Sequence, residues 1–251
     1  MIYCEPMEEE LVMNTIKINK RNVKMIAHRG VSGLETENTC AAFVAAGNRS
    51  FWGIETDVHV TKDGKFVIIH DDTMSRVSGV NLVVEESTLE ELQAIPLFDR
   101  GEGGFRTDLK VPTLKDYISI CKFYEKQAIL EFKNRIKYED IVRIVDLFIE
   151  MVYLENVIFI SFDWDNLIDL RRILPKHQVQ YLTGEPDEAL IDKLITNKIE
   201  LDVWSPCLTK EVIDKLHANG RSVNCWTVDD PKVAEQLIDL GVDYITTDIL
   251  E

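Results

Sequence analysis

The chain has 251 residues with 45% apolar content, and its 28 basic and 44 acidic residues give a formal net charge of −16. This charge argues against general nucleic-acid binding, which needs a basic surface, and against adhesion to anionic membranes. An anionic substrate would therefore need a local cluster of positive charge. The length suits one α/β barrel or two smaller domains.

The N-terminal segment MIYCEPMEEELVMN is acidic and lacks the basic stretch and apolar core of a signal peptide. The chain has no uninterrupted run of about 18 apolar residues, so we expect no membrane span and no stable membrane anchoring. Its five cysteines are scattered without a Cys-x-x-Cys pair, which favours reduced thiols. We therefore expect a cytoplasmic protein.

Short apolar or β-branched runs recur along the chain and alternate with amphipathic helical patterns. This alternation predicts βαβ units with a parallel sheet. Eight runs fit a closed (β/α)₈ barrel, or TIM barrel, in a single domain over residues 1–251. The eight predicted strands are 23–27, 53–58, 128–133, 156–161, 178–182, 200–205, 221–228 and 242–247.

A ninth run, residues 65–70, follows Asp63 and Gly64, which form a strong signal for a tight turn. We therefore predict a β-hairpin that extends the second barrel strand. Residues 71–112 then break the alternation, and we expect them to form an insertion that lies over one face of the barrel.

Two further features concern the insertion and the chain ends. Within the insertion, Thr88 and Glu91 fit the capping box of a short helix. The chain stops at Glu251, just after the eighth predicted strand, so a full closing helix does not fit there. Residues 1–20, which include the apolar segment LVMNTIKI, are expected to form an N-terminal extension that covers this flank of the barrel.

Three acidic residues fall near the ends of two predicted strands, where the chemistry of parallel barrels concentrates. Glu55 and Asp57 share one face of their strand, because side chains two residues apart point the same way. Glu131 and Lys133 are related in the same way. Three carboxylates in a poorly hydrated pocket need a counter-charge, which Mg²⁺ or Ca²⁺ supplies. The alternative is a set of solvated rim charges or an ion pair with Lys133.

His28 and His70 each end an apolar run, and both are candidates for acid–base catalysis because imidazole titrates near physiological pH. For either one alone, a hydrogen-bonded core or rim histidine is the alternative. Arg29 and Lys133 would supply the positive charge that a phosphate needs, and Gly30 would let the backbone turn sharply. These parts suit metal-assisted phosphoryl transfer. The remaining histidines are expected at the surface: His59, on the hairpin, His177 and His217.

The sequence resembles the glycerophosphodiester phosphodiesterase family, of the phospholipase C-like phosphodiesterase superfamily. The matching segments run in the family's order from about residue 23 to residue 248: AHRG, ENT, ETDVHVTKDGKFVIIHDDT, VPTL, LEFK, CWTV and GVDYITTD. That family folds as a (β/α)₈ barrel with a small insertion after strand two, in agreement with the strand count. The resemblance implies a hydrolase that splits a glycerophosphodiester into an alcohol and sn-glycerol 3-phosphate.

The resemblance also implies how the substrate is held. Glu55, Asp57 and Glu131 would bind one divalent cation, Mg²⁺ or Ca²⁺. Arg29 and Lys133 would hold the phosphate oxygens of this small-molecule substrate.

By the same resemblance, His28 and His70 would be the acid–base pair and Trp226 would pack against the glycerol. Without the resemblance, a core aromatic is the simpler interpretation of Trp226. We expect one histidine, assisted by the metal, to remove a proton from the glycerol 2-hydroxyl, which attacks phosphorus while the other histidine protonates the leaving alcohol. Water would then open the cyclic glycerol phosphate with the histidine roles reversed. The internal hydroxyl is already placed beside the phosphate, which is an entropic advantage.

Two positions near these motifs depart from the family's pattern, and two others, Glu37 and Asn38, do not belong to the predicted catalytic set. Thr36 replaces the family's usual proline, and Asp229 stands where an asparagine is common. Asn38 is expected to cap the helix that follows it, and Glu37 is expected to have a supporting role.

Three other functions are possible for a barrel of this kind, and each makes a different demand on the sequence. A lysophospholipase D-type enzyme would need an apolar path for an acyl chain, which GVNLVV and IPLF in the insertion would form unless they make its own core. A non-catalytic barrel would have lost a catalytic residue, and none is lost. An aldolase would use Lys133 for a Schiff base, but a lysine beside a carboxylate stays protonated.

Overall fold

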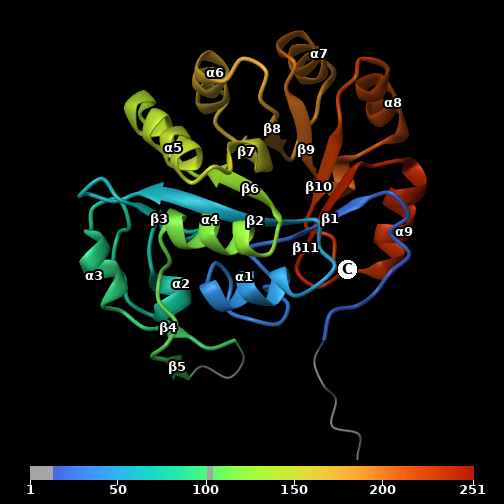
Figure 1. The fold of residues 1–251 in the computed structure, drawn as a ribbon. Coiled ribbons are helices and arrows are strands. Elements are labelled where there is room, and N and C mark those ends of the chain that lie inside the picture. Colours follow the sequence, from blue (N-terminus) through green and yellow to red (C-terminus); the bar gives the residue numbers. More distant parts are fainter. Residues whose placement is uncertain (1–13, 101–103) are drawn as a thin grey trace, which may run out of the picture.

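Eight parallel strands close into a barrel in the computed structural model, which describes residues 14–100 and 104–251 (Figure 1). The barrel strands are β1 (Lys24–Ala27), β2 (Gly53–Val60), β6 (Gln127–Phe132), β7 (Val157–Ser161), β8 (Val179–Thr183), β9 (Glu200–Trp204), β10 (Val223–Trp226) and β11 (Tyr244–Thr247). The ring is closed because β1 pairs with β2 on one side, as at Ala27 and Ile54, and with β11 on the other. The predicted (β/α)₈ fold is confirmed.

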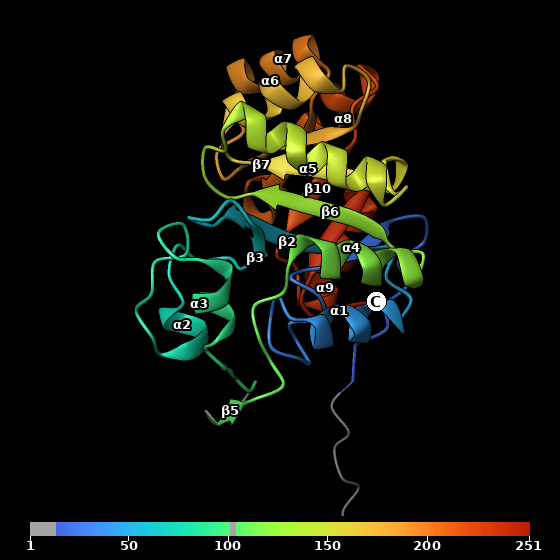
Figure 2. The ribbon, with the colours of Figure 1, turned by 60° about the vertical axis from the view of Figure 1, so that its left-hand side comes forward.

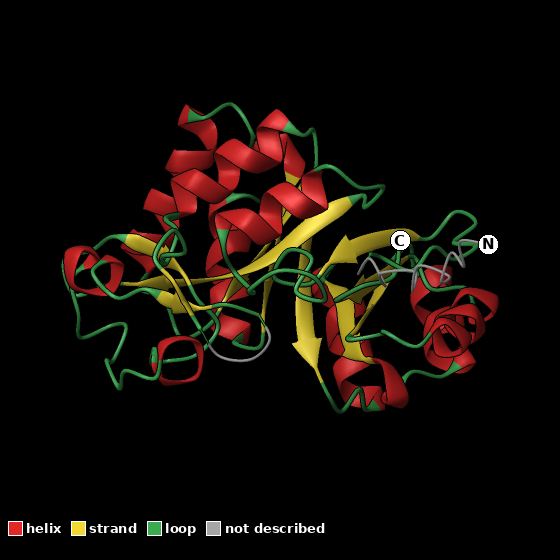
Figure 3. Cartoon of the chain, turned by 90° about the horizontal axis from the view of Figure 1, so that it is seen from below, coloured by secondary structure: helices red, strands yellow, loops and turns green. Residues whose placement is uncertain are grey.

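Helices pack on the outer side of these strands (Figures 1 and 3). They are α1 (Cys40–Gly47), α4 (Leu114–Phe123), α5 (Tyr138–Glu150), α6 (Trp164–Ile173), α7 (Glu188–Asn197), α8 (Lys210–Ala218) and α9 (Pro231–Leu240), with short 3₁₀ turns η1 (Leu154–Asn156) and η2 (Ser205–Cys207). Their buried faces join the core; for example, the rings of Phe43 and Tyr117 pack 5.1 Å apart between α1 and α4. No helix among the described residues is long and apolar enough to cross a membrane.

The predicted hairpin is present and lengthens the second barrel strand. β2 continues beyond the ring and pairs in antiparallel fashion with β3 (Phe66–Ile68), so that His59 lies opposite Val67. Gly64 occupies the turn with φ of +70°, a conformation that glycine adopts without strain. His59 is only 1% exposed, so the prediction that it is an exposed hairpin residue is wrong.

The segment after the hairpin forms a small subdomain beside the barrel (Figure 2). It contains α2 (Ser75–Ser78), α3 (Leu89–Gln93), β4 (Leu97–Phe98) and β5 (Phe105–Arg106). The capping box of Thr88 and Glu91 at the start of α3 is confirmed. A second apolar core lies under these elements and includes Met74, Val84 and Leu97. The apolar segments of the insertion are therefore used in its own packing.

The chain ends meet at the flank where an eighth helix would otherwise lie. Within the described residues no helix follows β11. Instead, Ile16 forms a parallel bridge with Leu250, and its carbonyl accepts a hydrogen bond of 2.9 Å from the N–H of Glu251. The side chain of Ile18 packs against the barrel core. Residues 14–20 thus lie along this flank, and the rest of the predicted extension, residues 1–13, lies outside the described residues.

Candidate active site

The three predicted metal ligands converge at the carboxyl end of two neighbouring strands. Glu55 and Asp57 lie on β2 and Glu131 on β6, with Asp57 directly opposite Glu131 in the strand register. Each carboxylate offers an oxygen that lies within 4.8 Å of those offered by the other two. All three side chains are buried, with exposures of 3%, 0% and 7%. Because side chains alternate along each strand, three carboxyl groups point into one buried space.

The protonation of this cluster reflects that crowding. Burial, followed by the charges of Asp57 and Glu131, raises the pKa of Glu55 well above its ordinary value. Burial and the charge of Asp57 likewise raise the pKa of Glu131 to about 8. Burial acts against the ionised form of Asp57 as well, but the positive charges of Lys133 and Arg29 hold its pKa below the ordinary value.

These residues fit a hard divalent cation. Asp57 Oδ1 and Glu131 Oε1 are buried and accept no hydrogen bond from the described residues. Lys133 Nζ lies 2.8 Å from Glu131 Oε1 and forms an ion pair with it, but the angle between the two groups does not suit a hydrogen bond. Unpaired carboxylate oxygens in a buried cluster are the ligands that Mg²⁺ and Ca²⁺ prefer, so the donor set and its burial both suit such an ion.

Two cationic side chains border the carboxylates. Lys133 Nζ also lies 3.5 Å from Asp57 Oδ1, and Arg29 Nε lies 3.6 Å from Asp57 Oδ2. The backbone N–H of Arg29, a residue with φ of +53°, donates a hydrogen bond of 2.8 Å to Glu55 Oε2. Both cationic side chains remain partly exposed, so each can reach a bound anion. This is the local positive charge that the acidic chain needs.

Each predicted catalytic histidine is oriented by a carboxylate. His28 Nδ1 lies 2.7 Å from Asp248 Oδ1, which also accepts a hydrogen bond of 2.8 Å from Ser32 Oγ. His70 Nδ1 lies 2.6 Å from Asp71 Oδ1. A carboxylate at Nδ1 favours the tautomer with the proton there, which leaves Nε2 free to exchange a proton with a ligand. Neither Nε2 has a hydrogen-bond partner among the described residues.

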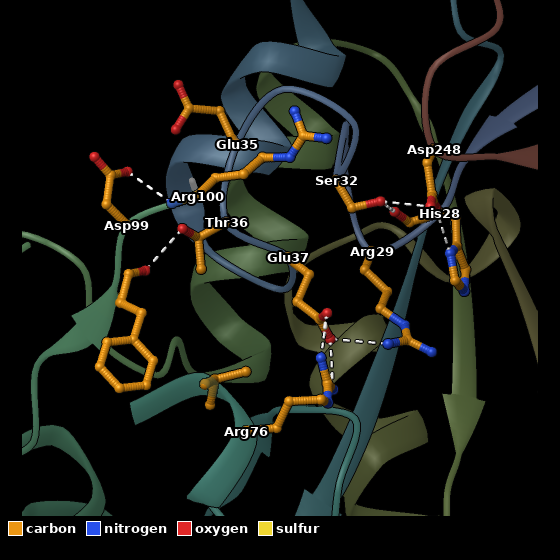
Figure 4. Close-up of a pocket in the computed structure, with 12 residues that line it drawn as sticks. His28, Arg29, Ser32, Glu35, Thr36, Glu37, Arg76, Asp99, Arg100 and Asp248 are labelled. Carbon is orange, nitrogen blue, oxygen red and sulfur yellow. Dashed lines mark hydrogen bonds and ion pairs between the residues drawn. The ribbon is translucent and has the colours of Figure 1, made fainter. Parts of the chain in front are cut away.

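Glu37 connects the barrel to the insertion (Figure 4). Its Oε1 accepts hydrogen bonds from Arg29 Nη1 at 2.8 Å and from Arg76 Nη2 at 2.9 Å. Arg76, on α2, in turn donates through Nε to Asp71 Oδ2 at 2.7 Å. Arg29 and His70 are thereby joined through one network of charged side chains.

Asn38 belongs to the site, and the prediction that it caps α1 is wrong. The cap is Thr39, whose hydroxyl accepts from the N–H of Ala42 at 3.2 Å. Asn38 instead has φ of +53°, and its Nδ2 donates to Asp57 Oδ2 at 2.7 Å. Its Oδ1 accepts a hydrogen bond of 2.7 Å from Thr56. The left-handed backbone turns this side chain toward the carboxylate cluster, where it fixes Asp57.

Six of the eight predicted site residues line a pocket of about 120 Å³: His28, Arg29, Glu55, His70, Glu131 and Trp226. Trp226, at the end of β10, lines it and makes an edge-to-face contact with Phe162, with ring centroids 5.8 Å apart. A second hollow of about 270 Å³ shares His28 and Arg29 and runs toward the insertion (Figure 4). Asp57 and Lys133 do not line this pocket, but Lys133 Nζ lies 2.8 Å from Glu131 Oε1, which does, and 3.5 Å from Asp57 Oδ1.

Sequence reasoning missed several residues that support the site. Asp248 and Asp71 orient the two histidines, although both stand in segments that carried the family resemblance. Asp202, on β9, lines the pocket and was not singled out; burial, followed by the charge of Glu131, raises its pKa well above the ordinary value. Asp202 lies in a predicted barrel strand at a position whose side chain points inward, and this alternation could have identified it as a site residue. Asp229 accepts a hydrogen bond of 2.7 Å from the N–H of Asp248.

Comparisons with known proteins agree with this geometry. Residues 28–251 match the model of the Glycerophosphoryl diester phosphodiesterase family. A glycerophosphodiester phosphodiesterase of Bacillus altitudinis is 32% identical over 236 residues, covering 90% of this chain and 94% of the relative. One from Caldanaerobacter subterraneus subsp. tengcongensis is 32% identical over 230 residues, covering 89% and 93%.

Solved structures show the same likeness. A phosphodiesterase of Oleispira antarctica, in complex with the product sn-glycerol-3-phosphate, matches with a TM-score of 0.82 and 25% identity, covering 90% of this chain and 92% of that one. A glycerophosphodiester phosphodiesterase of Parabacteroides distasonis matches with a TM-score of 0.76 and 30% identity, covering 90% and 93%.

Proposed function

The chain belongs to the glycerophosphoryl diester phosphodiesterase family and is an enzyme of that kind, and we propose that it hydrolyses glycerophosphodiesters to an alcohol and sn-glycerol 3-phosphate with one divalent cation as cofactor. One observation carries the proposal. Two histidines, each held by a carboxylate, line one pocket with Arg29, Glu55 and Glu131. Lys133 contacts both Glu131 and the buried Asp57 beside them. This set matches what phosphoryl transfer needs: charge neutralisation at the phosphate and proton transfer on either side of it.

Glu55, Asp57 and Glu131 are the residues that would hold Mg²⁺ or Ca²⁺. When bound, such a cation supplies charge neutralisation at the phosphate and polarises its oxygens. Arg29 and Lys133 add donors for the remaining phosphate oxygens. The hydrogen bonds of Arg29 to Glu37 and Glu55 fix its position before the substrate arrives, which reduces the cost of ordering it on binding.

In the first step that we propose, His70 accepts the proton of the glycerol 2-hydroxyl. The hydroxyl oxygen bonds to phosphorus, and the bond between phosphorus and the oxygen of the headgroup alcohol breaks. His28 donates a proton to that leaving oxygen. Burial lowers the pKa of His70, which keeps its ring neutral at pH 7 and suits a proton acceptor. The products are the free alcohol and cyclic glycerol phosphate.

The second step reverses these roles. His28, now neutral, accepts a proton from water, whose oxygen bonds to phosphorus. The bond between phosphorus and the glycerol 2-oxygen breaks, and His70 returns its proton to that oxygen. The product is glycerol 3-phosphate, and both histidines regain their starting protonation. Because the nucleophile of the first step is part of the substrate, a diester that lacks this hydroxyl cannot follow the path.

A panel assay tests the proposal. Choline, ethanolamine, inositol and glycerol diesters of glycerol phosphate are incubated with the enzyme in Mg²⁺, in Ca²⁺ or in EDTA, and released glycerol 3-phosphate is measured. We expect activity with at least one cation and none in EDTA. Undiminished activity in EDTA would remove the cation from the mechanism, and inactivity on all four diesters would contradict the substrate class.

The alternative of a lysophospholipid substrate was suggested by two apolar segments of the insertion, GVNLVV and IPLF, and the structure does not favour it. The apolar segments of the insertion contribute Val84 and Leu97 to a buried core, with Leu82 and Ile95 packed against it. Most of their apolar side chains are therefore used in packing, although Val80 and Val83 remain exposed. Faster hydrolysis of lysophosphatidylcholine than of glycerophosphocholine in the same assay would restore that alternative.

A further inference from the structure

The catalytic pocket has a charged half and an apolar half. His28, Arg29, Glu55 and Glu131 form the first, whereas Ile160 and Leu182 belong to the second together with Phe162. The phosphate is drawn to the charged half by Arg29 and the cation. The glycerol carbons must then extend toward the apolar half, where a hydroxyl needs a hydrogen-bonding partner.

Two polar atoms in that half have no partner within the described residues. Asp202 Oδ1 and Trp226 Nε1 are both buried, and neither makes a hydrogen bond. The whole Asp202 residue is 1% exposed. An unpaired buried donor or acceptor costs stability, so their presence together in the lining of one pocket points to a ligand group that completes them.

The two residues are neighbours on the inner face of the barrel. Asp202 on β9 lies opposite Asn224 on β10, and Trp226 follows two residues later on the same face of β10. Their hydrogen-bonding capacities are complementary, because an indole N–H only donates and a carboxylate oxygen accepts. A hydroxyl group can satisfy both at once, since it accepts one hydrogen bond and donates another. An ammonium group only donates and a methyl group does neither, so neither of them can satisfy both.

We propose that Asp202 and the Trp226 indole bind the terminal hydroxyl of the substrate's glycerol moiety, and that Asp202 determines specificity for glycerophosphodiesters. This inference rests on the proposed function. The 2-hydroxyl faces the histidines as nucleophile and the phosphate oxygens face the cations, so the terminal hydroxyl is the group left for the apolar half. Asp202 acts through positioning and takes no part in proton transfer.

The test uses two diesters that differ by one hydroxyl. The first is the best glycerophosphodiester of the panel, and the second is the matching diester of propane-1,2-diol, which keeps the 2-hydroxyl and lacks only the terminal one. We expect the wild-type enzyme to prefer the first by about 100-fold or more in kcat/KM, because a site built to bind a hydroxyl rejects the analogue without it. In Asp202→Leu the preference should fall to within about threefold of unity, through loss on the glycerol diester alone.

Two further variants separate positioning from packing. Asp202→Asn keeps the shape and an acceptor oxygen, and should recover at least about a tenth of the wild-type preference. Glu200→Gln is the matched control at the far end of β9, where Glu200 is bound by Arg221 at 2.9 Å, and its preference should equal that of wild type. Thermal unfolding of Asp202→Leu should show a midpoint no lower than that of wild type, because leucine removes an unpaired buried carboxyl.

The outcomes distinguish this inference from the proposed function. Wild-type enzyme that hydrolyses both diesters equally well would overturn the inference and leave the proposed function standing. Asp202→Leu that folds normally but loses activity equally on both diesters would show that Asp202 only supports the barrel. Wild-type enzyme inactive on every diester would overturn the proposed function and the inference with it.

Discussion

His28 Nδ1 and Asp248 Oδ1 lie 2.7 Å apart, although 220 positions separate them in the chain. His28 follows β1 and Asp248 follows β11, and these two strands are neighbours because the barrel closes. Asp248 is itself fixed by Ser32 Oγ and by its own N–H, which donates to Asp229. Closure of the fold therefore sets both the position and the tautomer of this imidazole.

The first prediction concerns that pair. Asp248→Asn should lower kcat by about 100-fold or more, because an amide can present its N–H₂ to Nδ1 and so favour the wrong tautomer. His28→Ala and His70→Ala should each lose at least about 100-fold, the usual contribution of positioned proton transfer. Steady-state kinetics on the best diester of the panel measure all three variants.

His217 offers the matched control for these variants. Its Nε2 lies 2.9 Å from Asp243 Oδ2 on the surface, so it forms a comparable histidine–carboxylate pair away from the pocket. His217→Ala should keep wild-type activity. More than about a tenth of wild-type turnover in His28→Ala or His70→Ala would show that the assigned acid–base pair is wrong.

The second prediction uses the pH dependence of His70. Burial lowers the pKa of His70, whereas the hydrogen bond from its ring to Asp71 acts to raise it. Removing the charge in Asp71→Asn should therefore lower the pKa of His70 further. If His70 is the base of the first step, the acid limb of kcat/KM against pH should move to lower pH, because the neutral ring then persists in more acidic solution.

The profile also identifies the role of the histidine. We expect the maximal rate of Asp71→Asn to fall by at least about tenfold, since the ring loses its charged partner. A shift of the basic limb instead would assign His70 as the acid of the first step. A profile with both limbs unchanged would mean that His70 does not control the rate in this pH range.

Strand positions were predictable because barrel strands are buried on both faces and read as continuous apolar runs. The run at 128–133 became β6, Gln127–Phe132, and that at 156–161 became β7, Val157–Ser161. The buried carboxylate cluster was predictable for a related reason. Alternation along each strand places every second side chain inside, so Glu55 and Asp57 had to share a face.

The partner of His28 depends on barrel closure, which no local sequence pattern predicts, whereas the partner of His70 is the next residue, Asp71. Asp248 directly follows the last strand, and only the pairing of β11 with β1 brings it to His28. Asn38 was misassigned for a different reason. Asn38 and Thr39 are both good helix caps, and the choice between them followed the backbone: Asn38 took a left-handed conformation, which asparagine tolerates better than threonine.

The third prediction tests the contact between Asn38 and Asp57. Asn38→Gly should keep the backbone, because glycine adopts positive φ readily, but it removes the amide that donates to Asp57 Oδ2 at 2.7 Å. Groups that orient a metal ligand typically contribute 10- to 100-fold to metal affinity, so we expect a loss of about that size. Isothermal titration calorimetry with Mg²⁺ and with Ca²⁺ measures the affinity of each variant for the metal.

Lys198→Gly provides the control for a glycine at positive φ. Lys198 has φ of +54° at the end of α7 and lies outside the site, so its replacement should leave metal affinity unchanged. Wild-type affinity in Asn38→Gly would mean that Asp57 holds its orientation without the amide. The ion pairs to Lys133 and Arg29 would then be sufficient.

The last prediction concerns stability and the pKa of His177. Its ring lies 5.5 Å from that of Phe159, and Nε2 lies 2.8 Å from the carbonyl of Val157, so Nε2 carries the proton. Burial lowers the pKa of this imidazole in the folded state. Below the unfolded pKa of about 6.5, the unfolded chain binds more protons than the folded one, so His177 costs stability as the pH falls through this value.

His177→Gln isolates this contribution, because the glutamine amide can still donate to the Val157 carbonyl but does not titrate. The free energy of unfolding, measured in urea at pH 7.5 and pH 5.5, should fall less on acidification in His177→Gln than in wild type. Comparing the two proteins cancels the losses from carboxylates, which both share. An equal fall in both would mean that the folded protein accepts a proton at His177 as readily as the unfolded chain does.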